Sequence, residues 1–176
     1  MLAKVLITVI VVIAVFLAFV STRKSQFRYE RSGVINAPAD KIYPYLCDFK
    51  KGLLWNPFAQ KDPNMKSSFS GPEAQVGSVM EFNGNREAGS GKLEITKMIP
   101  NQTVEMKLTM TSPFNAENLV HYELTPEGNG TRFSWAMEGD GGFMGKLITV
   151  FMDCEKMIAG EFEKGIAQLK TIVEKN

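Results

Sequence analysis

Residues 143–175, FMGKLITVFMDCEKMIAGEFEKGIAQLKTIVEK, decide the fold. Apolar side chains recur there every three or four positions, which is the repeat of one helix face. They are Leu147, Phe151, Cys154, Ile158, Phe162, Ile166, Leu169 and Val173. Charged residues fill many of the other positions, so the opposite face can lie in water. The pattern predicts one long helix from Phe143 to Lys175 with one buried face.

Segments of alternating apolar and polar residues precede this helix, as in strands with one buried face. Gly, Pro and Asn separate them, and Asn129-Gly130 is expected to supply the positive φ of a tight hairpin. The predicted strands cover residues 26–36, 65–70, 78–83, 89–99, 102–110, 115–126 and 130–139. Because an amphipathic helix buries its apolar face against such a sheet, we predict an α+β fold. A seven-stranded, antiparallel, curved sheet wraps the long C-terminal helix.

Two short helices are expected between the first two strands. Residues 37–40 (Ala-Pro-Ala-Asp) end the first strand, and Asp40 or its neighbour caps a helix that runs through Leu46. Pro44 is tolerated only in a first helical turn, so this helix must be short or start late. The second helix is expected over residues 49–54, and Trp55-Asn56-Pro57 ends it.

The apolar face of the predicted sheet is aromatic, rich in methionine and nearly free of charge. Together with the C-terminal helix it defines a candidate ligand cavity, lined by Met80, Phe82, Leu93, Ile95, Met106, Leu108, Met110, Tyr122, Phe133, Trp135, Met137, Phe151, Ile158, Phe162 and Gly165. Gly160 and Gly165 interrupt the helix at a cost of about 1 kcal/mol each relative to alanine. They serve either close helix–sheet packing, the commoner reason, or space for a bound molecule.

The composition of the chain argues against several classes of partner and cofactor. A net charge of +1 argues against a nucleic-acid partner, which needs clustered Lys and Arg. Cys47, Cys154 and the single histidine, His121, match no metal, haem or redox motif, so no cofactor or metal is expected, although an oxygen-only site stays open. The strand alternation places His121 with Glu123 on the outer face. Because no nucleophile has an adjacent base, no catalytic residue is predicted.

The N-terminus carries an uncharged run from Val5 to Val20, with Lys4 before it and Arg23-Lys24 after it. Extended through Thr22 it approaches the roughly 17–25 residues that span a bilayer core. A cleaved signal peptide is the alternative, but Leu17-Ala18-Phe19-Val20 lacks the small residues of a cleavage site. We interpret residues 1–24 as a retained single-pass anchor and residues 25–176 as one domain. The flanking cations favour a cytoplasmic domain only slightly.

The predicted order of elements resembles the START-like or Bet v 1-like superfamily, and within it the polyketide cyclase/dehydrase-like (SRPBCC) proteins. The similarity spans about residues 27–175 and is carried by residues 34–43 (VINAPADKIY), Trp55-Asn56-Pro57, Asp62-Pro63, Gly71, Val76-Gly77-Ser78, Gly84-Asn85, Gly89, Gly91 and residues 162–170 (FEKGIAQLK). The resemblance implies a helix-grip fold with a cavity between sheet and helix. Members of that superfamily bind lipids, sterols, plant hormones or polyketides, and some are enzymes.

Three functions fit these observations. The leading hypothesis is a non-enzymatic, membrane-anchored domain that binds a small hydrophobic or amphipathic, lipid-like ligand. The second is an enzyme of cyclase or hydrolase type, which requires an inward-facing acid and base. The third is a protein-interaction module whose interior is simply a packed core. The sequence specifies neither the ligand nor the oligomeric state.

Overall fold

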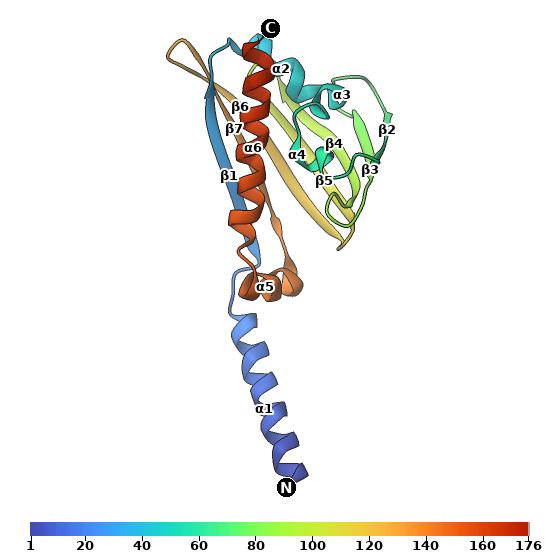
Figure 1. Cartoon of the computed structure of the whole chain (residues 1–176), viewed down its shortest axis with the longest axis vertical. Coiled ribbons are helices and arrows are strands. Elements are labelled where there is room, and N and C mark those ends of the chain that lie inside the picture. Colours follow the sequence, from blue (N-terminus) through green and yellow to red (C-terminus); the bar gives the residue numbers. More distant parts are fainter. Residues whose placement is uncertain (176) are drawn as a thin grey trace.

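The computed structural model describes residues 1–175. In chain order the elements are α1 (Leu2–Ser21), β1 (Gln26–Ile35), α2 (Ala39–Cys47), α3 (Phe49–Gly52), α4 (Pro57–Gln60), β2 (Lys66–Ser70), β3 (Val79–Asn83), β4 (Ser90–Ile99), β5 (Thr103–Ser112), β6 (Ala116–Glu127), β7 (Gly130–Asp140), α5 (Gly142–Phe151) and α6 (Cys154–Glu174). Figure 1 shows α1 projecting from one end of the domain and α6 lying along the curved sheet.

The seven strands form one antiparallel sheet in the order β1-β7-β6-β5-β4-β3-β2. Strands β2 to β7 follow one another as a meander, and β1 pairs with β7, so the first strand lies beside the last. The predicted α+β fold is confirmed. In the β6–β7 hairpin, however, the positive φ (57°) belongs to Gly128, whereas Asn129 does not share it. Glycine adopts this conformation without a steric cost, so it takes the first central turn position.

One face of the sheet and one face of α6 form the core. The buried residues alternate along β5 and β6, as predicted, and on β7 up to Trp135, which Ala136 follows as a second buried residue. The buried strand residues include Ile95, Val104, Met106, Val120, Tyr122, Leu124, Phe133 and Trp135. From α6 the buried residues are Ala159, Phe162, Gly165, Ile166, Leu169 and Val173. The apolar repeat of α6 therefore does face the sheet, as an amphipathic helix must to remove that stripe from water.

The prediction of one uninterrupted helix from Phe143 to Lys175 is wrong. The chain leaves the helical conformation at Met152, whose φ and ψ are −132° and 136°, and α6 begins after Asp153. The Asp153 side chain accepts a hydrogen bond from the Lys156 backbone N–H at 3.0 Å, so it caps α6. The apolar spacing from Phe151 to Cys154 continues across the break, which hides it from a periodicity argument.

Two expectations for the short helices also need correction. Helix α2 begins at Ala39 with Pro38 as its N-cap, and Pro44 lies inside it. The proline removes the bond to the Asp40 carbonyl, in an exposed first turn where water can replace it. A third short helix, α4, follows the two predicted ones. Asn56 caps it through the Phe58 N–H at 3.0 Å, with Pro57 at its start, so the segment that ends one helix begins another.

Helix α1 extends away from the rest of the molecule. Among residues 1–175 it is the one helix long and apolar enough to cross a membrane, and only 6% of its most apolar window is buried. The same properties fit an N-terminal signal sequence. Helix α1 contacts the domain through α5, where the rings of Phe16 and Phe151 lie 6.1 Å apart.

Candidate functional site

The interior between the helices and the sheet is filled by aromatic rings. Trp55 lies 5.4 Å from Trp135 and 5.7 Å from Tyr122, measured between ring centroids. Trp135 stacks on Phe162 of α6 at 4.3 Å. Edge-to-face and stacked pairs at these distances are favourable beyond the area they bury. The cluster therefore joins α6, the sheet and the segment between α3 and α4 into one packed unit.

The predicted cavity omitted the residues of the α2–α4 segment (residues 39–60) that line the interior, and Trp55 is the largest of them. It is 1% exposed, and its Nε1–H donates to the Tyr45 carbonyl oxygen at 2.9 Å. Because it lies between two single-turn helices, neither a helical nor a strand repeat includes it, and its sequence context indicated only a turn. A large aromatic residue beside Asn-Pro was the available sign that this turn packs inward.

Gly165 provides close helix–sheet contact. A Cβ atom there would lie 2.6 Å from Cζ3 of Trp135 and 3.0 Å from Cδ of Pro57. At Gly160, by contrast, an added Cβ would meet nothing within 4 Å. The space beside Gly165 is thus occupied by Trp135, and of the two reasons for a glycine at this position the geometry favours packing.

A small hollow remains beneath α2 and α3, with a volume of about 20 Å³. Its walls are Tyr45, Leu46, Asp48, Phe49, Gly52, Leu53, Trp55, Asn56, Met80, Leu93, Met106 and Tyr122. This volume accommodates about one water molecule, whereas small-molecule sites have roughly 300–1,000 Å³. Figure 1 places α2 and α3 at the end of the domain opposite α1, so the hollow lies far from that helix.

The fifteen residues expected to line a cavity fall into separate places. Met80, Leu93, Met106 and Tyr122 line the hollow. The core beside it holds Ile95, Phe133, Trp135, Phe162 and Gly165, with Leu108, Met137 and Ile158 partly buried against it. Met110 is partly exposed on β5. Phe151 lies outside the interior, where it is 73% exposed and faces Phe16 of α1.

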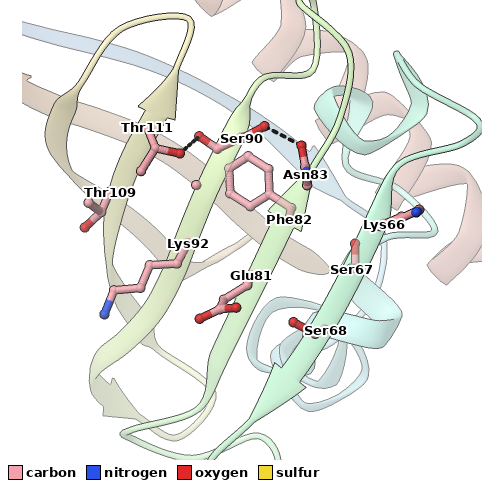
Figure 2. A pocket seen from close by; sticks show the side chains of 11 residues that line it. Lys66, Ser67, Ser68, Glu81, Phe82, Asn83, Ser90, Lys92, Thr109 and Thr111 are labelled. Atoms are coloured by element: carbon pink, nitrogen blue, oxygen red, sulfur yellow. Dashed lines mark hydrogen bonds between the residues drawn. The ribbon is translucent and has the colours of Figure 1, made fainter.

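A wider depression of about 530 Å³ lies over strands β2 to β5, and Phe82 lines it. Figure 2 shows its hydroxyl and charged side chains, among them Glu81, Lys92 and Thr109. The Ser90 hydroxyl donates to Asn83 Oδ1 at 2.8 Å, and the Thr111 hydroxyl donates to the Ser90 carbonyl oxygen at 3.2 Å. These bonds link strand ends. No residue that lines this depression forms a nucleophile–base pair.

His121 lies beside two charged residues on the outer face of the sheet. Its Nε2 lies 3.3 Å from Glu138 Oε1, and Arg28 donates to the other carboxylate oxygen at 2.8 Å. The hydrogen bond from Arg28, aided by the His121 side chain, lowers the pKa of Glu138. His121 does not line the hollow, in agreement with the predicted strand alternation.

Tyr122 lies in the interior, where it is 5% exposed. Burial raises the pKa of Tyr122, so its hydroxyl stays protonated and neutral at physiological pH.

Polar contacts hold α4 against α6: Gln168 Nε2 donates to Gln60 Oε1 at 2.9 Å, and Lys61 lies 3.4 Å from Glu161. We call these two contacts the α4–α6 clasp. It connects α4 and the residue after it to α6.

Comparison with known proteins agrees with this architecture. The family described as "Polyketide cyclase / dehydrase and lipid transport" matches residues 26–174. This chain belongs to that family. No curated protein is similar to it at a significant level.

Solved structures share the Bet v 1-like fold of this family. A protein from Chromobacterium violaceum superposes with a TM-score of 0.58 at 17% identity, over 85% of this chain and 97% of the other. The Aha1 dimer from Colwellia psychrerythraea gives 0.59 at 22% identity, over 84% and 96%. Ara h 8.0201 gives 0.60 at 11% identity, over 86% and 99%. At these identities the similarity establishes the fold alone.

Proposed function

We propose that this protein is a membrane-anchored domain that binds a small hydrophobic or amphipathic, lipid-like ligand between the α2–α4 segment (residues 39–60) and the sheet. The observation that carries the proposal is the lining of the hollow beneath α2 and α3. Apolar and aromatic side chains form most of its wall, and Tyr122, Asn56 and Asp48 add a few polar groups. This combination is typical of sites that bind apolar molecules in a fixed orientation. Membership of a family whose description includes lipid transport supports the same class of ligand.

Binding requires the α2–α4 segment to move, because the hollow of about 20 Å³ is far smaller than a lipid-like molecule. Helices α3 and α4 have four residues each, and helices this short have little stability of their own. The Trp55–Tyr45 hydrogen bond and the α4–α6 clasp hold them in place. Releasing these contacts frees the Trp55 ring to leave the interior and enlarges the hollow.

We infer that the protein binds its ligand without catalysing a reaction. Cyclase-type chemistry needs an acid and a base that face the ligand. Asp48 is the one carboxylate that lines the hollow, and it already accepts the N–H groups of Lys50 and Lys51 as the N-cap of α3. Oδ1 of Asp48 accepts both bonds and so caps the helix, and the wall of the hollow holds no second carboxylate, histidine or lysine to complete an acid–base pair.

Helix α1 is the membrane anchor in this proposal. Its 20 residues extend about 30 Å, the thickness of a bilayer hydrocarbon core. Arg23 follows it, with its guanidinium carbon 4.8 Å from the Phe19 ring centroid, at the level expected for a headgroup contact. The contact between Phe16 and Phe151 favours a retained helix, because cleavage after α1 would remove one of its partners.

Fluorescence quenching tests the binding site in the full-length protein. The chain has two tryptophans, and Trp55 lines the hollow, so a brominated stearic acid bound there should quench the emission. Leu53→Phe fills space in the hollow and should weaken quenching at least tenfold. Its matched control is Leu54→Phe, since Leu54 is 59% exposed and absent from the wall, and it should bind like wild type. Equal quenching in all three proteins, or none, contradicts the proposed site.

One observation favours a second function, that of a protein-interaction domain with a packed core. The aromatic cluster and the contact between Gly165 and Trp135 leave no ligand-sized space along α6 in the described structure. A wild-type protein that neither responds to the brominated acid nor carries a small molecule after purification supports this second function.

A further inference from the structure

We propose that α5 is a second membrane element, which lies in the surface of the bilayer leaflet that the domain faces. The inference rests on the proposed anchoring by α1 and adds a surface and a partner to it. The partner is the bilayer itself, at the level where headgroups meet acyl chains.

Helix α5 is apolar and exposed. Lys146 is its only charged residue, yet no residue of α5 is buried. Phe143, Met144, Phe151 and Met152 are 47%, 52%, 73% and 47% exposed. Large apolar side chains with this exposure are unfavourable in water, and their concentration in one short segment indicates an interaction site.

The position of α5 identifies the partner. Figure 1 shows α5 at the junction of α1 and the domain, lying across the line of α1 and α6. Phe151 contacts Phe16, which lies five residues before Ser21, the end of α1. At 1.5 Å per residue Phe16 lies about 7.5 Å below that end. If α1 spans the bilayer, Phe151 packs against a residue at the depth of roughly 5–10 Å at which interfacial helices bury their apolar face.

Polar contacts hold α5 at this place. Lys146 Nζ donates to the Ser21 carbonyl oxygen at 2.9 Å, at the C-terminal end of α1. The Gly141 N–H donates to the Ser25 carbonyl oxygen at 3.0 Å, and the Asp140 carboxylate accepts from the Gly142 N–H at 2.8 Å. The start of α5 is thus bonded to the linker between α1 and β1. A lysine at this level also matches the preference of cations for the lipid headgroup region.

Depth-dependent quenching of a fluorophore tests the proposal in the full-length chain. An environment-sensitive dye is attached at Met144→Cys, in a Cys47→Ala, Cys154→Ser background, and the protein is reconstituted in vesicles of phosphatidylcholine and phosphatidylglycerol. Spin-labelled lipids carry the quencher either shallow or deep in the acyl chain. Val12→Cys in the middle of α1 reports the anchor, and Leu54→Cys, exposed two residues after the end of α3, is the control for water.

The expected result is at least threefold quenching at Met144→Cys, stronger with the shallow label, and at Val12→Cys, stronger with the deep label, with none at Leu54→Cys. Quenching at Val12→Cys without quenching at Met144→Cys overturns the role of α5 and leaves the anchor intact. A shielded dye at Met144→Cys that lipids do not quench also overturns it, and indicates a protein partner. Absence of quenching at both positions contradicts the anchor itself. Phe143→Cys repeats the test should Met144→Cys fail to fold, as judged by its tryptophan emission.

Discussion

At Gly165 the lack of a side chain allows α6 to approach the sheet. Trp135 and Pro57 occupy the space that a Cβ atom would need, whereas Gly160 on the same helix has open space around it. The two glycines therefore have the same helix propensity and opposite surroundings, which makes them a matched pair.

Gly165→Ala is expected to destabilise the protein by about 1–3 kcal/mol, because a Cβ atom 2.6 Å from Trp135 forces the aromatic cluster to shift. Gly160→Ala is expected to stabilise it by up to ~1 kcal/mol, since only the helix propensity changes. Denaturant unfolding of both variants in detergent measures the difference. Equal stabilisation by the two substitutions would mean that the interior beside α6 has free space.

Single residues of the interior show which side-chain positions the sequence predicted and which it did not. Strand alternation placed Tyr122 and Trp135 inside and His121 outside, because a two-residue period assigns every side chain of a strand to a face. It did not indicate that Trp55 would fill the space between the two layers, since a residue in a turn belongs to no period. The expected cavity along α6 was a property of the fold family, and side-chain volumes at single positions determine whether it stays open.

At the scale of elements, the break between α5 and α6 separates two roles. Helix α6 packs on the sheet, whereas α5 has no buried residue and contacts α1. The apolar period of residues 143–175 correctly predicted helical structure. It did not distinguish the exposed apolar side chains of α5 from the buried ones of α6. Asp153 was the residue that marked the boundary, because its side chain caps α6.

The α4–α6 clasp gives a prediction for pH. Burial acts to raise the pKa of Glu161, but hydrogen bonds and charges from Lys164 and Lys61 outweigh it and hold the pKa below the ordinary value of 4.5. A lowered pKa means that Glu161 contributes stability above its unfolded-state pKa and loses it as the pH falls through the folded-state value. Wild type should therefore melt at a higher temperature than Glu161→Gln at pH 7, and the gap should close at acid pH.

The control for this comparison is Glu123→Gln, because Glu123 is exposed on β6 and forms no ion pair within residues 1–175. Its melting temperature should follow that of wild type at every pH. A gap between wild type and Glu161→Gln that persists below the folded-state pKa would show that the amide disturbs packing and that the charge is not responsible.

At the scale of the whole molecule, α1 and α5 lie at one end and the hollow beneath α2 and α3 at the other (Figure 1). A domain held by α1 and α5 would direct the α2–α4 segment away from the bilayer. In this arrangement a ligand enters from the aqueous side, and a lipid from the same membrane would first have to leave it.

Full-length protein should remain in the membrane fraction after alkaline and high-salt washing, because burial of α1 in hydrocarbon does not depend on charge. Deletion of residues 1–24 removes the one candidate membrane span among residues 1–175, and the 10-residue α5 is too short to replace it, so the remaining domain should be released in soluble form. Protein sequencing of the mature N-terminus provides the control. A chain that begins near Ser21, or full-length protein in the soluble fraction, would contradict the anchor.

Native mass spectrometry of the full-length protein, extracted in detergent from its own membranes, tests the central claim of ligand binding most directly. We expect a bound small molecule of lipid-like mass in wild type and in Leu54→Phe, and its loss in Leu53→Phe, whose added ring occupies the hollow. Wild-type protein that carries no such molecule, in detergents mild enough to retain bound lipid, would contradict it.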